Sequence, residues 1–164
     1  AVDVGYGQLA WKLQSDPRVE VHDRTNVRTL DPASVAPAPD IVVGDMSFIS
    51  LTLVLPALVA AAAPDADFLL MVKPQFEIGK ERLGHGGVVR NPEHHVETVE
   101  NVARCAIGLG LDIAAIAPSP LPGPSGNVEY FLYMRRDYPE PINPQELTEY
   151  IRAAVAEGPA GGAL

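Results

Sequence analysis

Four ionisable residues stand next to short apolar runs, where the ends of buried strands are expected. Asp3, Asp45 and Lys73 each follow such a run directly, and Glu129 lies near the start of another. Open α/β sheets bind their ligands beyond the carboxyl ends of the strands. These four side chains are therefore the first candidates for a functional site.

Lys73 is the most informative of the four. It ends a five-residue apolar run, which places its amine at the rim of a sheet, and an amine that is poorly hydrated gives up its proton more readily than one in water. Such an amine suits general-base chemistry, and the carboxylates of Asp45 and Glu129 would orient it. The alternative is a solvated lysine in a surface salt bridge, which is how most lysines occur.

Asp3 has two interpretations that the sequence leaves open. A carboxylate at the end of an early strand commonly accepts hydrogen bonds from both ribose hydroxyls of a nucleotide-like cofactor, because each of its oxygens is an acceptor. In the alternative, Asp3 only caps the turn that leads into a helix beginning near Gln8.

The segment 73–90 is locally basic and rich in glycine. Its charged residues are Lys73, Lys80, Arg82 and Arg90 against Glu77 and Glu81, and its glycines are Gly79, Gly84, Gly86 and Gly87. Long glycine-rich loops in small domains are often functional, so we expect this one to close over a substrate. The alternative is an ordinary exposed loop.

Composition limits the class of protein. The chain has 164 residues, enough for one domain, with 47% hydrophobic residues and a net charge of −9, which argues against non-specific nucleic-acid binding by this chain alone. Its single cysteine, Cys105, cannot form an internal disulfide, which favours a reducing, cytoplasmic compartment. The longest apolar stretch, 51–63, is shorter than the roughly 20 residues of a membrane span. His85, His94 and His95 have no ligand spacing that completes a metal site.

The order of apolar runs and helix-length segments predicts an α/β fold, with a mostly parallel sheet flanked by helices. Strands are expected at 1–4, 19–23, 41–43 (a central strand), 68–72, 113–117 and 128–134 (an edge strand). Helices are expected at 8–15, from a Ser50 cap to about 63, at 92–109 between an Asn91 cap and Gly110, and at 144–156.

Four longer strings resemble one family. They are DVGYGQL at 3–9, DMSFIS at 45–50, VKPQFE at 72–77 and PLPGPSGNVEYF at 120–131. In this order, over residues 1–158, the chain resembles the TlyA family of FtsJ-like, S-adenosylmethionine-dependent ribosomal RNA ribose methyltransferases, which are also labelled hemolysins. The resemblance implies a Rossmann-like methyltransferase fold.

The resemblance also implies a set of site residues. Asp45, Lys73 and Glu129 match the last three members of the family's Lys-Asp-Lys-Glu catalytic set. Contacts to S-adenosylmethionine are implied for Asp3, Val4, Asn26, Asp45 and Met46, and contacts to the RNA substrate for Lys80, Arg82, Ser125 and Asn127. No metal is implied.

Family members carry further parts that this chain does not contain. These are an S4-like RNA-binding domain, through which we expect contact with ribosomal RNA or a ribosomal subunit, and a glycine-rich cofactor loop with the first catalytic lysine. The chain does not begin with Met and opens inside an apparent strand. We therefore expect a partial methyltransferase domain at 1–158, missing its first strand, and a disordered tail at 159–164.

The implied activity is methyl transfer to a ribose 2'-hydroxyl, with Lys73 as the base. Methylation of an exocyclic base nitrogen is disfavoured, since such sites carry Asn/Asp-Pro-Pro-Tyr/Phe where this chain has Asp45-Met-Ser-Phe. A nicotinamide-dependent oxidoreductase is disfavoured by the Lys, Asp and Glu set. Two further alternatives are a membrane-active hemolysin without enzymatic activity and an inactive, truncated methyltransferase.

Overall fold

A computed structural model describes residues 1–160 of the chain. The strands are β1 (Ile41–Gly44), β2 (Asp67–Val72), β3 (Asp112–Pro118) and β4 (Tyr130–Arg135). The α-helices are α1 (Trp11–Gln14), α2 (Leu51–Ala61), α3 (Pro74–Glu77), α4 (Pro92–Gly108) and α5 (Leu147–Glu157). Short 3₁₀ turns lie at η1 (Val27–Thr29), η2 (Pro32–Val35), η3 (Lys80–Arg82) and η4 (His85–Gly87).

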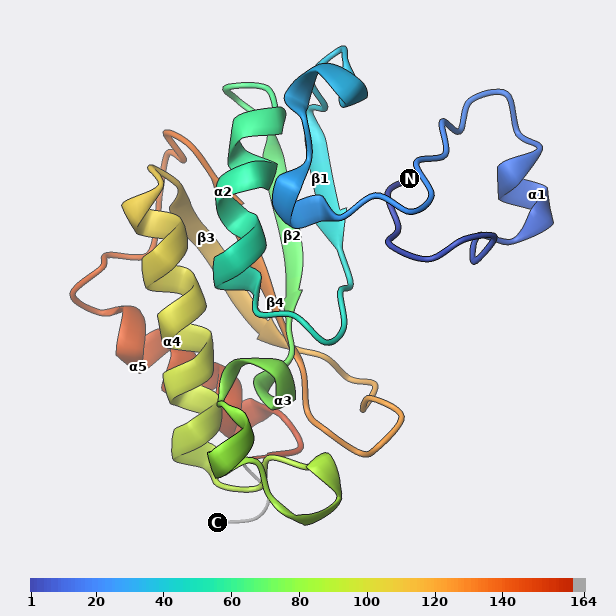
Figure 1. Ribbon diagram of the computed structural model, residues 1–164. Helices are drawn as coiled ribbons and strands as arrows, with labels where there is room; N and C mark the ends of the chain where they lie inside the picture. Colours follow the sequence, from blue (N-terminus) through green and yellow to red (C-terminus); the bar gives the residue numbers. More distant parts are fainter. Residues whose placement is uncertain (161–164) are drawn as a thin grey trace.

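The four strands form one sheet in the order β1-β2-β4-β3 (Figure 1). The predicted α/β class is confirmed, but the prediction of a mostly parallel sheet needs correction. Only β1 and β2 pair in parallel, whereas β4 is antiparallel to both β2 and β3. The reversal arises because β4 follows β3 through a loop without a crossover helix, and a parallel return would need one. The prediction of β4 as an edge strand is also wrong, since it lies between β2 and β3.

The reversed direction of β4 decides where the site forms. Because β4 is antiparallel to β2, its first residue, Tyr130, is paired with Val72, the last residue of β2. The residue before β4 and the residue after β2 therefore meet at one edge of the sheet. The carboxyl end of β1 lies at the same edge, since β1 is parallel to β2.

The core lies on one face of the sheet. Alternate strand residues point to this face, and α2, α4 and α5 contribute most of the rest of a single apolar cluster. On β2, Phe68 and Leu70 are fully buried there, while Leu69 between them remains 43% exposed on the opposite face. Ile41 and Val43 of β1 share that opposite face and are exposed.

The longer helices begin and end close to where the sequence predicts. The Ser50 side chain accepts a hydrogen bond from the Thr52 amide and caps α2, and the Asn91 side chain accepts one from the Glu93 amide and caps α4. Gly110, with φ of 86°, follows the end of α4 and supplies the left-handed residue that often stops a helix.

The first thirty residues differ from the prediction. The expected strands at 1–4 and 19–23 are reduced to one parallel bridge between Val2 and His22, and the expected helix at 8–15 is the single turn α1. This segment extends away from the sheet on the side of β1 (Figure 1). Strand pairing needs a neighbour, and among residues 1–160 β1 pairs with β2 alone. The prediction of 41–43 as a central strand is therefore not met within residues 1–160, where β1 lies at the edge of the sheet.

At the other end of the described chain, Ala160 is buried against the core, within the tail that was expected to be disordered. The rest of that tail, 161–164, lies outside the described residues.

Candidate active site

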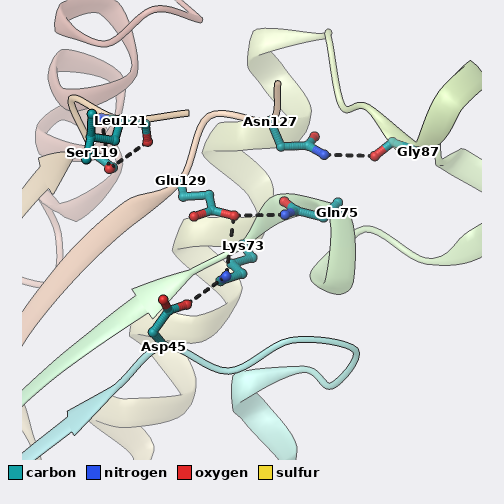
Figure 2. Close-up of polar contacts among 8 residues, drawn as sticks. All are labelled: Asp45, Lys73, Gln75, Gly87, Ser119, Leu121, Asn127 and Glu129. Carbon is teal, nitrogen blue, oxygen red and sulfur yellow. Dashed lines mark hydrogen bonds and ion pairs between the residues drawn. The ribbon is translucent and has the colours of Figure 1, made fainter. Parts of the chain in front are cut away.

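The structure brings Lys73, Asp45 and Glu129 together at the sheet edge (Figure 2). Lys73 Nζ lies 2.7 Å from Asp45 Oδ1 and 3.6 Å from Glu129 Oε1. The lysine and glutamate side chains are nearly buried, with 11% and 6% of their surface exposed, whereas Asp45 is 67% exposed. The amine is therefore held between two carboxylates, one facing solvent and one facing the interior.

Short-range sequence features explain how Lys73 is placed. Val72 is the last residue of β2, and Pro74 begins α3, where a proline is favoured because the first helical amide has no partner. The last residue of α3, Glu77, accepts hydrogen bonds from Ser50 Oγ and from the Leu51 amide at the start of α2. Burial raises the pKa of Glu77, and these hydrogen bonds partly oppose the rise. The segment after Lys73 is thereby tied to the start of α2.

A cavity of about 1240 Å³ lies between the first thirty residues and β1. Its lining includes all five residues expected to contact the cofactor: Asp3, Val4, Asn26, Asp45 and Met46. Asp45 belongs to both the cavity and the Lys73 cluster, so a ligand in the cavity would border the amine. Asp3 fits both of its interpretations, because its Oδ1 accepts a hydrogen bond from the Gly5 amide at the turn while the residue also lines the cavity.

The residues expected to contact substrate differ in their exposure and in the partners that they already have. Lys80 and Ser125 are exposed. Arg82 is paired through both guanidinium nitrogens with Glu97, 2.6 and 2.7 Å away. Asn127 is 2% exposed, and its amide is occupied by the Val89 amide and the Gly87 carbonyl, each at 2.9 Å. In this geometry Asn127 anchors the glycine-rich loop, so its expected contact with RNA would require that loop to move.

Comparison with known proteins shows to which family the chain belongs. The sequence model of the family described as FtsJ-like methyltransferase matches residues 1–136. The chain belongs to the FtsJ-like methyltransferase family. The family assignment made from the sequence strings is confirmed.

Individual relatives agree with the FtsJ-like assignment. The chain is 52% identical over 159 residues to the 16S/23S rRNA (cytidine-2'-O)-methyltransferase TlyA of Mycobacterium tuberculosis, covering 97% of this chain and 59% of the relative. A solved protein named "Putative hemolysin from Streptococcus thermophilus" superposes with a TM-score of 0.83 at 35% identity, over 95% of this chain and 57% of that one. Another hemolysin-named structure, from Lactococcus lactis, superposes with a TM-score of 0.81 at 35% identity, over 90% of this chain and 73% of that one. The chain thus spans about three fifths of the TlyA relative.

Two questions about the described part of this FtsJ-like chain bear on the alternatives: whether a helix could span a membrane and whether side chains cluster as metal ligands. None of its helices combines the length and the apolar character of a membrane span. Nor do three or more His, Cys, Asp or Glu side chains within residues 1–160 cluster as metal ligands would.

Beside the FtsJ-like site, a buried histidine ties the glycine-rich loop to β4. His95 Nε2 lies 2.9 Å from the Val89 carbonyl, which can only accept, so Nε2 carries the proton and donates. His95 Nδ1, 3.1 Å from the Tyr130 hydroxyl, therefore accepts from it. The contact with Tyr130 needs the neutral ring, whereas Nε2 donates to Val89 in either form. Burial lowers the pKa of His95 below 6.5, against the opposing effect of the Val89 carbonyl.

We expect His95 to make the stability of this domain pH-dependent. Because its folded pKa is lowered, the unfolded chain binds more protons between that pKa and 6.5, so stability present above 6.5 is lost as pH falls through this window. The unfolding temperature should fall from about pH 7.5 to about pH 5.5 more steeply in the wild type than in His95→Gln. The exposed His85, as His85→Gln, is the control and should keep the wild-type slope. Equal slopes in all three proteins would contradict the assignment.

Sequence reasoning missed three residues at this site. Gln75 donates to Glu129, and Gly123 lies against the same carboxylate. Phe48 is 89% exposed, has a left-handed φ of 63°, and packs on Phe76 of α3 with ring centroids 4.9 Å apart. Positive φ is uncommon for a bulky residue. All three lie inside the strings DMSFIS, VKPQFE and PLPGPSGNVEYF, which are the signal that would have found them.

Proposed function

We propose that this chain carries the catalytic part of an S-adenosylmethionine-dependent methyltransferase acting on ribose 2'-hydroxyls of ribosomal RNA. The observation that carries the proposal is the nearly buried Lys73 amine between Asp45 and Glu129, beside the large cavity. Support comes also from the activity for which the M. tuberculosis relative is named, 16S/23S rRNA (cytidine-2'-O)-methyltransferase. We further propose that the protein works in the cytoplasm and meets ribosomal RNA or a ribosomal subunit, partly through an S4-like domain outside this chain.

The cavity residues have the chemistry that the cofactor requires. A carboxylate such as Asp3 can accept from a ribose diol, and apolar side chains such as Val4 and Met46 can pack against an adenine ring. The carboxylates of Asp3 and Asp45 also suit a ligand that carries a sulfonium and an ammonium group. Bound S-adenosylmethionine would supply an electrophilic methyl group.

Lys73 would act on the 2'-hydroxyl, which is a weak nucleophile while it keeps its proton. In the neutral form, Nζ would accept that proton as the 2'-oxygen bonds to the methyl group that S-adenosylmethionine would supply, with the cofactor's sulfur leaving as a thioether. Lys73 would end the step protonated, beside a 2'-O-methyl ribose. Asp45 and Glu129 stabilise the positive charge that the amine gains, from positions that are already fixed.

An aromatic pair beside the cluster, of which Phe48 is exposed and Phe76 is half-buried, fits a nucleotide substrate. Phe48 and Phe76 present an apolar surface next to Asp45 and Lys73 in sequence, and stacking on aromatic rings is a common way to hold an unpaired base. The exposed Lys80 offers a charge for a phosphate.

A nucleoside analysis tests the proposal. The protein in its full native length is incubated with ribosomal RNA and S-adenosylmethionine carrying a labelled methyl group, and the digested nucleosides are identified by mass spectrometry. The expected result is label on the ribose. Label on a base would overturn the proposed acceptor, and no transfer together with leakage of liposomes would favour the hemolysin alternative.

A further inference from the structure

The carboxylate of Glu129 is held by more than its ion pair. Gln75 Nε2, on α3, donates to Glu129 Oε1 at 3.0 Å, whereas Lys73 Nζ is 3.6 Å from the same oxygen (Figure 2). The amide is therefore the nearer donor. Lys73 itself is closer to Asp45, at 2.7 Å, so the lysine alone does not fix where Glu129 points.

Gly123 also lies against the same oxygen. A Cβ built on Gly123 would lie 2.8 Å from Glu129 Oε1, closer than real Cβ contacts allow, and 3.4 Å from its Cδ, in ordinary contact. The turn that carries Gly123 has a fixed shape, because the Gly123 amide donates to the Asn127 carbonyl at 2.9 Å and its own carbonyl accepts from the Gly126 amide at 2.8 Å. The absence of a side chain at this position makes room for the carboxylate.

The orientation of the Gln75 side-chain amide indicates that this residue holds the Glu129 carboxylate in place. Its Oε1 is buried and has no hydrogen-bond partner among the described residues, which costs free energy. Turning the amide over would place Oε1 against the Glu129 carboxylate, and two acceptors repel. The amide thus keeps the donor on Glu129 and leaves its own acceptor unsatisfied.

We propose that Gln75 and Gly123 are positioning residues that together hold Glu129 Oε1 at its present distance from the Lys73 amine. This inference rests on the proposed function, because the distance matters for the positive charge that Lys73 gains during methyl transfer. The electrostatic attraction weakens as the carboxylate moves away. Neither residue touches the reacting atoms.

Steady-state kinetics of RNA methylation by the full native protein test the proposal. Gln75→Met keeps the length of the side chain but has no donor, and Gly123→Ala adds the obstructing Cβ. Each should lower kcat about tenfold to a hundredfold, the range expected from a misplaced catalytic group, with KM for S-adenosylmethionine and RNA changed less than about twofold. The controls are Gln145→Met, at an exposed position, and Gly108→Ala, which has open space around its Cβ. Both controls should keep the wild-type kcat.

A double-mutant cycle separates positioning from general destabilisation. In a Glu129→Gln background, Gln75→Met and Gly123→Ala should have almost no further effect on kcat if they act through the carboxylate. Additive losses would overturn the proposal.

A readout without activity separates this proposal from the proposed function. The Gln75 side-chain amide protons should exchange slowly with solvent in the wild type, because the amide is held by a buried carboxylate, and quickly in Glu129→Ala. Fast exchange in the wild type would overturn the positioning role, whatever the activity. Slow exchange in a protein that transfers no methyl group would support the positioning of Glu129 by Gln75 and would refute only the proposed methyltransferase function.

Discussion

Lys73→Ala should reduce RNA methylation by about a hundredfold to ten-thousandfold, the contribution expected of a positioned general base. The variant removes the only amine that the structure places between two carboxylates at this sheet edge, and no other described basic side chain pairs with Asp45 or Glu129. Single-turnover rates with saturating S-adenosylmethionine measure the loss directly. Binding of S-adenosylmethionine should stay within a few-fold of the wild type, because Lys73 does not line the cavity.

Lys73→Arg distinguishes a base from a structural ion pair. An arginine keeps the positive charge and can still pair with carboxylates, yet it stays protonated and cannot accept the hydroxyl proton. We therefore expect Lys73→Arg to fold and to be nearly as inactive as Lys73→Ala. Lys12→Ala, at an exposed lysine, is the matched control. An active arginine variant would show that charge alone is sufficient and would remove Lys73 as the base.

The central cluster could be predicted from sequence because its members follow from strand ends. Asp45 and Lys73 come directly after apolar runs, and such runs end at one edge when their strands are parallel. Glu129 does not follow its strand but precedes it. It reaches the same edge only because β4 is antiparallel, which the predicted mostly parallel sheet did not contain.

The residues around the cluster could not be predicted in the same way. That Gln75 donates to Glu129 depends on a contact between residues 54 positions apart. Asn127 looks like an exposed loop residue in sequence, surrounded by Pro, Ser and Gly, but its amide satisfies two backbone groups of another loop. Such contacts depend on the packing of loops, which local residue patterns do not encode.

Local patterns succeeded where an element is long and has both a cap and a stop, as in α4. They failed in the first thirty residues, where apolar alternation predicts strands and the structure forms a single bridge. A strand is stabilised by its neighbours, so a correct pattern without a paired edge does not produce one. The same dependence limits what residue patterns can say about the outer edge of β1.

Phe68→Ala should destabilise the domain far more than Leu69→Ala, although the two residues are adjacent on β2. The Phe68 side chain is fully buried among the core residues, and its truncation should cost about 3–5 kcal/mol, through lost burial and the cavity left behind. The unfolding temperature should fall by about 10 °C, as expected for a domain of this size.

Leu69 is the matched comparison because it also lies on β2 between β1 and β4 but points to the opposite face, where it is 43% exposed. Its truncation should cost no more than about 1 kcal/mol, near the range for surface positions. Thermal unfolding of both variants measures the difference. If Leu69→Ala were as costly as Phe68→Ala, the face that carries Ile41, Val43 and Leu69 would have to be covered in solution, and the one-sided core would be wrong.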